Sequence, residues 1–324
     1  MQSRRLEVAC DESGFSGTNL LDPNFEVITH ASVHVDARTA AECVALIRSR
    51  YRYSATEYKS TQLLRQGPAL EWLLRTLTGR GHVHLTDKSY FVVTRLVDLL
   101  IGDPSYAAGT SLAPELRSLA LTLHRQGPEV FGQVKWNAFL TAFVAMMRTK
   151  RHRVINSPAV DAFFYHLDLL DSDRLDLSCL RDARPQVEKV LTELLGERSS
   201  VPPPLEPLLP ALLETARHWS AGGRSVAIVH DEQSALTPHR VGRISALLAD
   251  TTQGPPPLLG LTMVDSRTDP RVQLADLLAG AARHIAVTEL HAEGSPVLTA
   301  LLRPYLSPHS LWSDIPSWTR LTSA

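Results

Sequence analysis

The sequence predicts an α/β fold in which strands and helices alternate near both ends of the chain, with a long helical stretch between them. Short apolar runs within residues 6–14 and 225–232 each end in two acids. In the first, the turn residues Ser13-Gly14 follow the acids. Segments of helical periodicity follow these runs, which is typical of α/β proteins. Residues 103–223 keep helical periodicity, broken by Pro and Gly, without a convincing strand pattern.

Length and composition are those of a globular protein. The chain has 324 residues, 44% of them hydrophobic, which suffices for one large domain or two smaller ones. The formal net charge of -1 gives no global attraction to nucleic acid, so any such binding must come from a local patch. The widely spaced Cys10, Cys43 and Cys179 argue against a disulfide framework and against a Cys-x-x-Cys metal site, and favour a reducing compartment.

The N-terminal residues do not resemble a secretory signal, and no segment approaches the ~20 apolar residues of a transmembrane helix. We therefore expect a cytoplasmic protein with no membrane partner.

The first part of the chain predicts strands that alternate with helices. A first strand ends at Asp11, and a second, antiparallel to it, covers residues 25–35. A third strand covers residues 83–88. The expected helices cover residues 36–51, with Asp36 as N-cap, then 69–77 and 90–101.

The last part resumes the strand pattern. Residues 225–230 form an apolar run that fits a central strand, and it ends at Asp231. A helix over residues 238–249, a strand over 258–264 and a helix over 271–287 follow, the last with Asp269 as N-cap.

Between these parts the chain predicts a helical insertion, which includes a helix over residues 131–150. The proline-rich residues 201–207 favour a stiff connector over a polyproline ligand for a partner. We expect four parts, namely residues 1–102 as the first half of the α/β domain, 103–223 as the helical insertion, 224–290 as the second half, and 291–324 as a C-terminal helix and tail.

Acids that follow predicted strands suggest the chemistry. Asp11 and Asp231 each stand at the carboxyl end of a strand, where ligands bind in open α/β sheets. Hydrolysis of a phosphodiester needs an activated water and relief of negative charge, which divalent ions supply, and Mg²⁺ is held by a few carboxylates. A single acid is more often a surface group, so the prediction rests on the repeated arrangement of a strand followed by an acid.

We predict that four carboxylates converge on a Mg²⁺ or Mn²⁺ site. The expected direct ligands are Asp11, Asp231 and Asp276, with Glu57 as a fourth candidate. Lys59 would steady a phosphate or a carboxylate, and Glu12, Ser266 and Gln273 would orient the ligands.

Asp276 is the least certain of these by pattern alone. It lies opposite the apolar stripe that includes Leu274 and Leu278 on a helical wheel, where a solvated acid is usual. The same side also carries small residues such as Ala275 and Ala279, which indicate close approach to a second surface. The pattern leaves the solvated acid and the cleft acid equally open.

Several motifs together resemble a bacterial family of domains of unknown function with an N-terminal Asp-Glu-Ser-Gly motif, regarded as ribonuclease H-like nucleases. The matching residues, scattered over about residues 6–282, are Asp11-Glu12-Ser13-Gly14, Glu57-x-Lys59, Asp87-Lys88, and Ser266 followed by Gln273-Leu274-Ala275-Asp276-Leu277-Leu278-Ala279-Gly280. The resemblance implies a ribonuclease H-like mixed sheet flanked by helices, carboxylates at Asp11, Asp231 and Asp276, and often a setting among defence or mobile-element genes. The large all-helical insertion departs from a minimal fold of this kind.

The expected function is therefore a metal-dependent nuclease, a hydrolase that acts on DNA or RNA. One alternative is a non-catalytic module that binds nucleic acid or protein, and another is a metal-dependent hydrolase of a small phosphoester. The helical insertion is also where we would expect a protein partner or a second copy of the chain to bind.

The densest basic run is a candidate contact for nucleic acid. It consists of Arg148, Lys150, Arg151 and Arg153, and a solvated helix end is the slightly favoured alternative.

A zinc site is a weaker alternative. His30 and His34 share one face of the second predicted strand, and His82 and His84 share one face of the third, so these imidazoles would approach one another if the strands pair. A polar strand face is the favoured interpretation.

Overall fold

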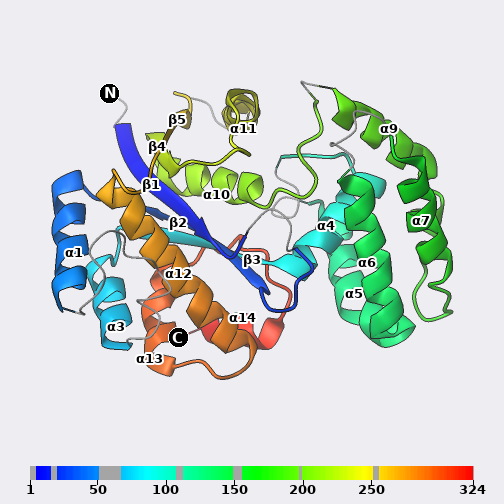
Figure 1. The fold of residues 1–324 in the computed structure, drawn as a ribbon, viewed down its shortest axis with the longest axis horizontal. Coiled ribbons are helices and arrows are strands. Elements are labelled where there is room, and N and C mark those ends of the chain that lie inside the picture. Colours follow the sequence, from blue (N-terminus) through cyan, green and yellow to red (C-terminus); the bar gives the residue numbers. More distant parts are fainter. Residues whose placement is uncertain are drawn as a thin grey trace.

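Five strands form a mixed sheet at the centre of the computed structural model, in the order β3-β2-β1-β4-β5 (Figure 1). The structure describes residues 5–15, 20–50, 67–106, 112–148, 155–196, 199–250 and 255–323. The strands are β1 (Arg5–Ser13), β2 (Val27–Val33), β3 (Gly81–Asp87), β4 (Ser225–Asp231) and β5 (Leu258–Val264). An α/β fold with a mixed sheet flanked by helices confirms the predicted fold class at this level.

The pairing of the strands sets the geometry of the sheet edge. The second strand runs antiparallel to the first, as predicted, and β3 runs antiparallel to β2. Parallel pairs join β1 to β4 and β4 to β5. The carboxyl ends of these three strands therefore meet at the same edge of the sheet, where ligands bind in open α/β folds.

One face of the sheet is covered by α12 (Pro270–Leu290), which crosses β1 and β2 (Figure 1). Thr29 of β2 donates a hydrogen bond from its hydroxyl to the Ala279 carbonyl at 2.7 Å, which ties the helix to the sheet. The helices that contact the outer side of α12 are α1 (Ala37–Arg50), α3 (Gly67–Thr76), α13 (Pro296–Leu302) and α14 (Ile315–Thr322), and a 3₁₀ turn, Arg303–Tyr305, follows α13. Helix α12 therefore lies between the sheet and these helices, and buried apolar side chains lie on both of its sides.

The opposite face is covered by α10 (Leu208–Ser220) and α11 (Pro238–Asp250). Buried side chains of these helices, such as Leu212 and Ile244, pack in one cluster with Val226 and Ile228 of β4. Helix α10 lies inside the range predicted as the insertion, yet it packs on the sheet.

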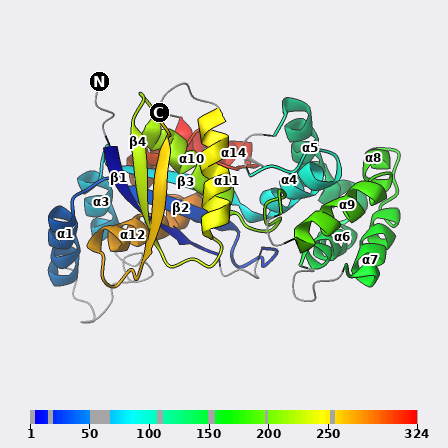
Figure 2. The ribbon, with the colours of Figure 1, turned by 90° about the horizontal axis from the view of Figure 1, so that it is seen from above.

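The remaining helices form a separate group beside the sheet (Figure 2). They are α4 (Lys88–Leu100), α5 (Pro114–Phe131), α6 (Gln133–Met147), α7 (Ser157–Asp168), α8 (Ser178–Arg181) and α9 (Arg184–Leu195), and they share an apolar core that includes Phe139, Phe143 and Phe163. The helix expected over residues 131–150 instead begins after a break at Gly132, whose φ of +83° suits glycine. As expected, the described residues between 103 and 223 contain no strand.

No helix in the described part of the chain combines the length and the apolar character that crossing a bilayer requires.

The packing of α12 on the sheet gives a stability prediction. Leu278 of α12 is fully buried in the cluster that joins the helix to β3 and to Tyr305. We expect Leu278→Ala to lower the free energy of unfolding by about 2–5 kcal/mol, because it removes buried methyl groups and leaves a cavity. Urea denaturation measures this loss.

The matched control is Val297→Ala, because the Val297 side chain is 49% exposed. The free energy of unfolding of Val297→Ala should lie within about 0.5 kcal/mol of the wild-type value. A Leu278→Ala protein as stable as this control would show that α12 does not hold the sheet in this way.

Candidate functional site

Asp11 and Asp231 stand beside each other at the carboxyl ends of two parallel strands. The register pairs Cys10 of β1 with His230 of β4, so the next residue of each strand is one of these acids. Ala9 and Val229, two positions earlier, pack in the cluster of α12. Since alternate residues of a strand point to the same face, both carboxylates project toward α12.

Asp276 reaches the same place from α12. It is half-buried, and its charge acts on Asp11, which is only 7% exposed. Burial raises the pKa of Asp11 well above its usual range, and the charges of Glu12, Asp276 and Asp231 raise it further. The Glu12 N–H, which donates to Asp11 Oδ1 at 2.7 Å, partly offsets these effects. Asp231 and Asp276 are thus both close enough for their charges to act on Asp11.

A hydrogen-bonded chain orients Asp231. The Ser266 backbone N–H donates to Asp231 Oδ1 at 3.0 Å, and Gln273 Nε2 donates to the Ser266 carbonyl at 2.9 Å. Arg48 of α1 donates to Gln273 Oε1 at 3.2 Å. Ser266 therefore contacts Asp231 through its main chain, and Gln273 contacts Ser266 but not Asp231.

Glu12 follows Asp11 but points to the opposite face, toward α10. Gln233 Nε2 donates to Glu12 Oε1, while Glu12 Oε2 is buried without a hydrogen-bond partner among the described residues. Burial raises the pKa of Glu12 to about 7, although the hydrogen bond from Gln233 lowers this pKa in part. The charges of Glu206, Asp231 and Asp276 contribute to the rise. The structure therefore places Glu12 behind the three acids, not among them.

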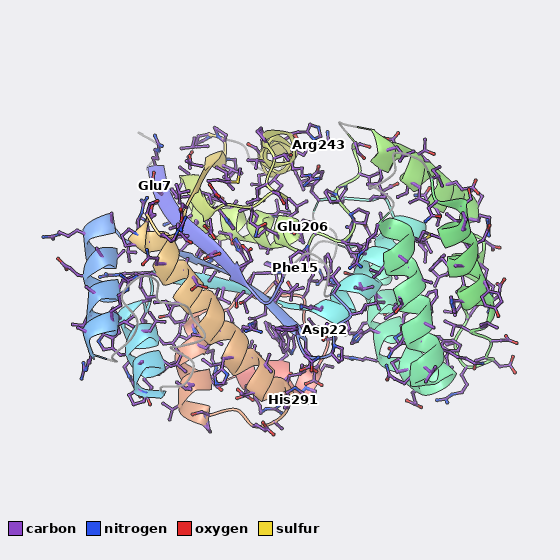
Figure 3. The ribbon with its side chains drawn as sticks, in the orientation of Figure 1. Glu7, Phe15, Asp22, Glu206, Arg243 and His291 are labelled. Atoms are coloured by element: carbon purple, nitrogen blue, oxygen red, sulfur yellow. The ribbon has the colours of Figure 1, made fainter. Side chains whose placement is uncertain are left out.

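Glu206 is a second, half-buried acid on this face. Partial burial raises the pKa of Glu206 to about 7, against the Leu208 N–H that donates to its carboxylate at 3.2 Å and the charge of Arg240. Glu206, Glu12 and Phe15 line a cavity of about 10 Å³, which has room for a single water molecule. Figure 3 labels Glu206 and Phe15.

Buried histidines complete the face under α10. His230 Nδ1 lies 2.9 Å from the Asp231 carbonyl, and because a carbonyl only accepts, this nitrogen carries the proton. In neutral His230 the Nε2 atom then accepts from His30 Nε2 at 3.2 Å, and His30 Nδ1 accepts from the Thr215 hydroxyl at 3.1 Å. Burial lowers the pKa of His30 well below its usual range and that of His230 to about 4, which keeps both neutral.

The zinc alternative does not gather its four histidines. His30 pairs with His84 across β2 and β3, and His82 is buried on the same face. His34, however, follows β2, is exposed, and contacts the Glu7 carbonyl at 2.9 Å through Nδ1.

Some of the predicted residues cannot be placed. Glu57, Lys59, Lys150, Arg151 and Arg153 lie outside the described residues, and the exposed Arg148 directly follows α6.

Sequence reasoning missed several polar groups that shape the site. Gln233, only two residues after Asp231, and Glu206, the only charged residue of the proline-rich segment 201–207, carried a weak positional signal. Arg48 lies in an ordinary amphipathic helix and carried none.

In chemical terms, Asp11, Asp231 and Asp276 supply the oxygen ligands that Mg²⁺ and Mn²⁺ take, and a divalent cation would offset their repulsion. Across the described ranges, no group of three or more His, Cys, Asp or Glu residues is already arranged to hold a metal ion. The donor set fits such an ion by chemistry and charge, and binding would require the side chains to draw together.

Fold and site together define a class: an α/β protein with one buried acid and one half-buried acid at the carboxyl edge of its parallel strands, and a half-buried acid on the helix that covers them. Comparisons of the chain with protein-family models, with curated proteins and with solved structures found no match.

The half-buried Glu206 gives a prediction about pH. Its pKa in the folded protein, about 7, lies above the ordinary value of 4.5, so the folded state holds a proton that the unfolded chain releases as pH rises between these values. Stability is therefore lost as pH rises through this window. Glu206→Gln keeps the carbonyl that accepts from Leu208, and should make the protein about 1–3 kcal/mol more stable at pH 8 than the wild type.

Urea denaturation with EDTA at pH 5 and pH 8 tests this expectation. The difference in the free energy of unfolding between Glu206→Gln and the wild type should be smaller at pH 5. Glu232→Gln, a change of the same kind at an exposed acid, is the control and should leave the free energy of unfolding unchanged at both pH values. An equal effect of both substitutions would mean that Glu206 is not held protonated by burial.

Proposed function

We propose that the protein is a metal-dependent nuclease that hydrolyses phosphodiester bonds of DNA or RNA, with Asp11, Asp231 and Asp276 as ligands of Mg²⁺ or Mn²⁺. The observation that carries the proposal is the pair Asp11 and Asp231 at the carboxyl edge of the parallel strands, with Asp276 of α12 near enough for its charge to act on Asp11. A mixed sheet flanked by helices agrees with the ribonuclease H-like fold that the resemblance implies.

The electrostatics of the site support a cation more than a purely structural role. Carboxylates that repel one another in a buried place lower the stability of the protein unless protons or a cation neutralise them. No lysine or arginine among the described residues forms a salt bridge within 4.0 Å to Asp11 or Asp231. Stability alone would favour residues without an ionisable group here, so the presence of three acids suggests a functional ligand.

A divalent ion bound there would polarise the phosphoryl oxygen and lower the pKa of a bound water to yield the attacking hydroxide. The chain supplies orientation. The Glu12 N–H fixes one oxygen of Asp11, and the Ser266 N–H fixes one oxygen of Asp231. Within the described ranges, no donor contacts the second oxygen of either acid, which a ligand would take. Preoriented ligands reduce the rearrangement that metal binding requires.

The first test is cleavage by Asp11→Asn. This change removes the charge and keeps the shape, so cleavage of labelled DNA and RNA with Mn²⁺ should fall by roughly 100-fold or more, as metal affinity is lost. Binding of nucleic acid should persist, because one negative charge near the phosphates has gone. Gel assays on single- and double-stranded substrates measure both.

Asp250→Asn, the same change at an exposed residue of α11, is the control and should cleave like the wild type. Undiminished cleavage by Asp11→Asn would refute this site. Binding without cleavage by every protein would favour the non-catalytic module, and hydrolysis only of a small phosphodiester would favour the small-substrate alternative.

The second test is thermal stability. A cation that binds only the folded protein stabilises it by about 2.7 kcal/mol at a concentration 100 times its dissociation constant. We expect Mn²⁺ to raise the melting temperature of the wild type at neutral pH and to have little effect on Asp276→Asn.

Protons compete for the same carboxylates, so the shift should be smaller at pH 5 than at pH 8. Glu232→Gln should keep the wild-type shift. A midpoint that millimolar Mn²⁺ leaves unchanged in the wild type would contradict a metal-binding role for the three acids.

A further inference from the structure

Helix α12 carries a cation on the same side as Asp276. Arg283 follows Asp276 by seven residues, which is two helical turns or roughly 10 Å along the axis. Positions seven apart share a face of a helix. The side of α12 that presents an acid to Asp11 therefore presents an arginine farther along, beyond the carboxyl end of β1.

The turn after the first strand is shaped around this arginine. Arg283 Nε donates to the Ser13 hydroxyl at 3.1 Å. An added Cβ at Gly14 would lie 2.7 Å from Arg283 Cδ and 2.4 Å from the Val27 carbonyl oxygen, and the φ of Gly14 is +94°. Glycine is thus required both by the backbone and by the arginine that lies across it.

Arg283 is available to bind an anion. Its guanidinium is half-buried, and no carboxylate of the described residues forms a salt bridge with it within 4.0 Å. Its contact with Ser13 uses Nε alone, so the paired Nη groups keep the geometry that grips a phosphate.

Lys88 adds a second positive charge nearby. It is the first residue of α4 and is buried, with its Nζ 5.3 Å from the centre of the Phe25 ring. Burial lowers the pKa of Lys88 to about 8, against the charge of Asp22 and with a smaller contribution from the charge of Arg283. A bound anion would offset the repulsion between the two cations.

A large cleft opens beside Lys88 and Phe25. Its volume is about 1010 Å³, and its lining includes Lys88, Phe25 and Asp22 as well as Trp136 and Asn137 of α6. Figure 3 labels Asp22 and His291 close to the end of α12 that lies next to this cleft. The Phe25 side chain is 41% exposed, so part of its ring is open to solvent.

The acids of this cleft already have partners within the protein. Asp22 accepts from the Asn24 N–H at 2.9 Å, and Glu26 lies 2.6 Å from His291 Nε2. Asp87 and Asp314 are N-caps, which accept from the Tyr90 N–H at 3.1 Å and from the Ser317 N–H at 2.8 Å.

We propose that Arg283, supported by Lys88, binds a phosphate of single-stranded nucleic acid a few nucleotides from the bond that faces Asp11, and that Phe25 stacks against an unpaired base of the same strand. The inference rests on the proposed function and specifies its substrate. Basic groups that follow the backbone and an aromatic ring that stacks on bases are the two elements of single-strand binding, whereas the bases of a duplex are stacked on each other.

Fluorescence anisotropy of labelled oligothymidylate and of its duplex with oligoadenylate tests the proposal, with EDTA present to prevent cleavage. Arg283→Gln should weaken single-strand binding about 10-fold or more, the usual loss for a charge-assisted hydrogen bond. The slope of log affinity against log salt should fall by about 0.7, as for one lost phosphate contact. Phe25→Ala should weaken single-strand binding about 5-fold or more and duplex binding little.

Arg174→Gln, at an exposed arginine paired with Glu129 in the helical region, is the matched control and should bind like the wild type. Arg283→Lys keeps the charge and should lose less affinity than Arg283→Gln, and equal melting temperatures of all variants would exclude a folding defect.

The outcomes separate the two proposals. Cleavage that depends on Asp11, combined with wild-type binding by both Arg283→Gln and Phe25→Ala, would overturn this inference alone. A wild-type protein that neither binds nor cleaves any nucleic acid would overturn the proposed function and this inference together. Weakening by Arg283→Gln that is equal for duplex and single strand, with no effect of Phe25→Ala, would overturn the assignment to single strands.

Discussion

The parallel register between β1 and β4 is the constraint on which the acidic site depends. It places Asp11 next to Asp231, and a shift of one residue would turn one of them to the opposite face of the sheet. The register is held by apolar side chains on both faces, with Ile228 packed under α10 and Val229 under α12. The apolar core thus holds the polar site in place, and neither acid needs an ion pair to keep its position.

The same alternation divides the charges between two faces. Asp11 faces α12, whereas Glu12 faces α10, where burial keeps His230 neutral. Through its Nδ1 proton His230 binds the carbonyl of Asp231, so the face under α10 fixes the backbone of an acid that projects to the other side. The buried polar face is therefore better explained as a support for the acidic edge than as a separate metal site.

Local pattern was enough to predict the end of β4 and the approximate positions of α1, α3, α4, α11 and α12, because each depends on short-range periodicity and on turn or capping residues. The predicted end of the first strand at Asp11 was wrong by two residues, because β1 continues to Ser13 through its pairing with β2. It could not predict that α10 packs on the sheet, since the apolar stripe of a helix does not identify its partner. The break at Gly132 was also missed, because apolar periodicity continues across it. Among the site residues, the acids after strands were predictable, while Glu206 and Arg283 reach the site only through tertiary packing.

The junction between β3 and α4 explains how the helical region can form one wall of the cleft. Asp87 is both the last residue of β3 and the N-cap of α4, and its carboxylate accepts from the Tyr90 N–H and the Ser89 and Ser313 hydroxyls. No loop separates the strand from the helix, so the sheet edge continues directly into the apolar core of the helical region. A junction tied by several hydrogen bonds resists bending more than an unrestrained linker does, which favours a cleft whose width is set by the fold and not by a hinge. The helices that follow this junction therefore lengthen the wall of the cleft without changing the strands that carry the acids.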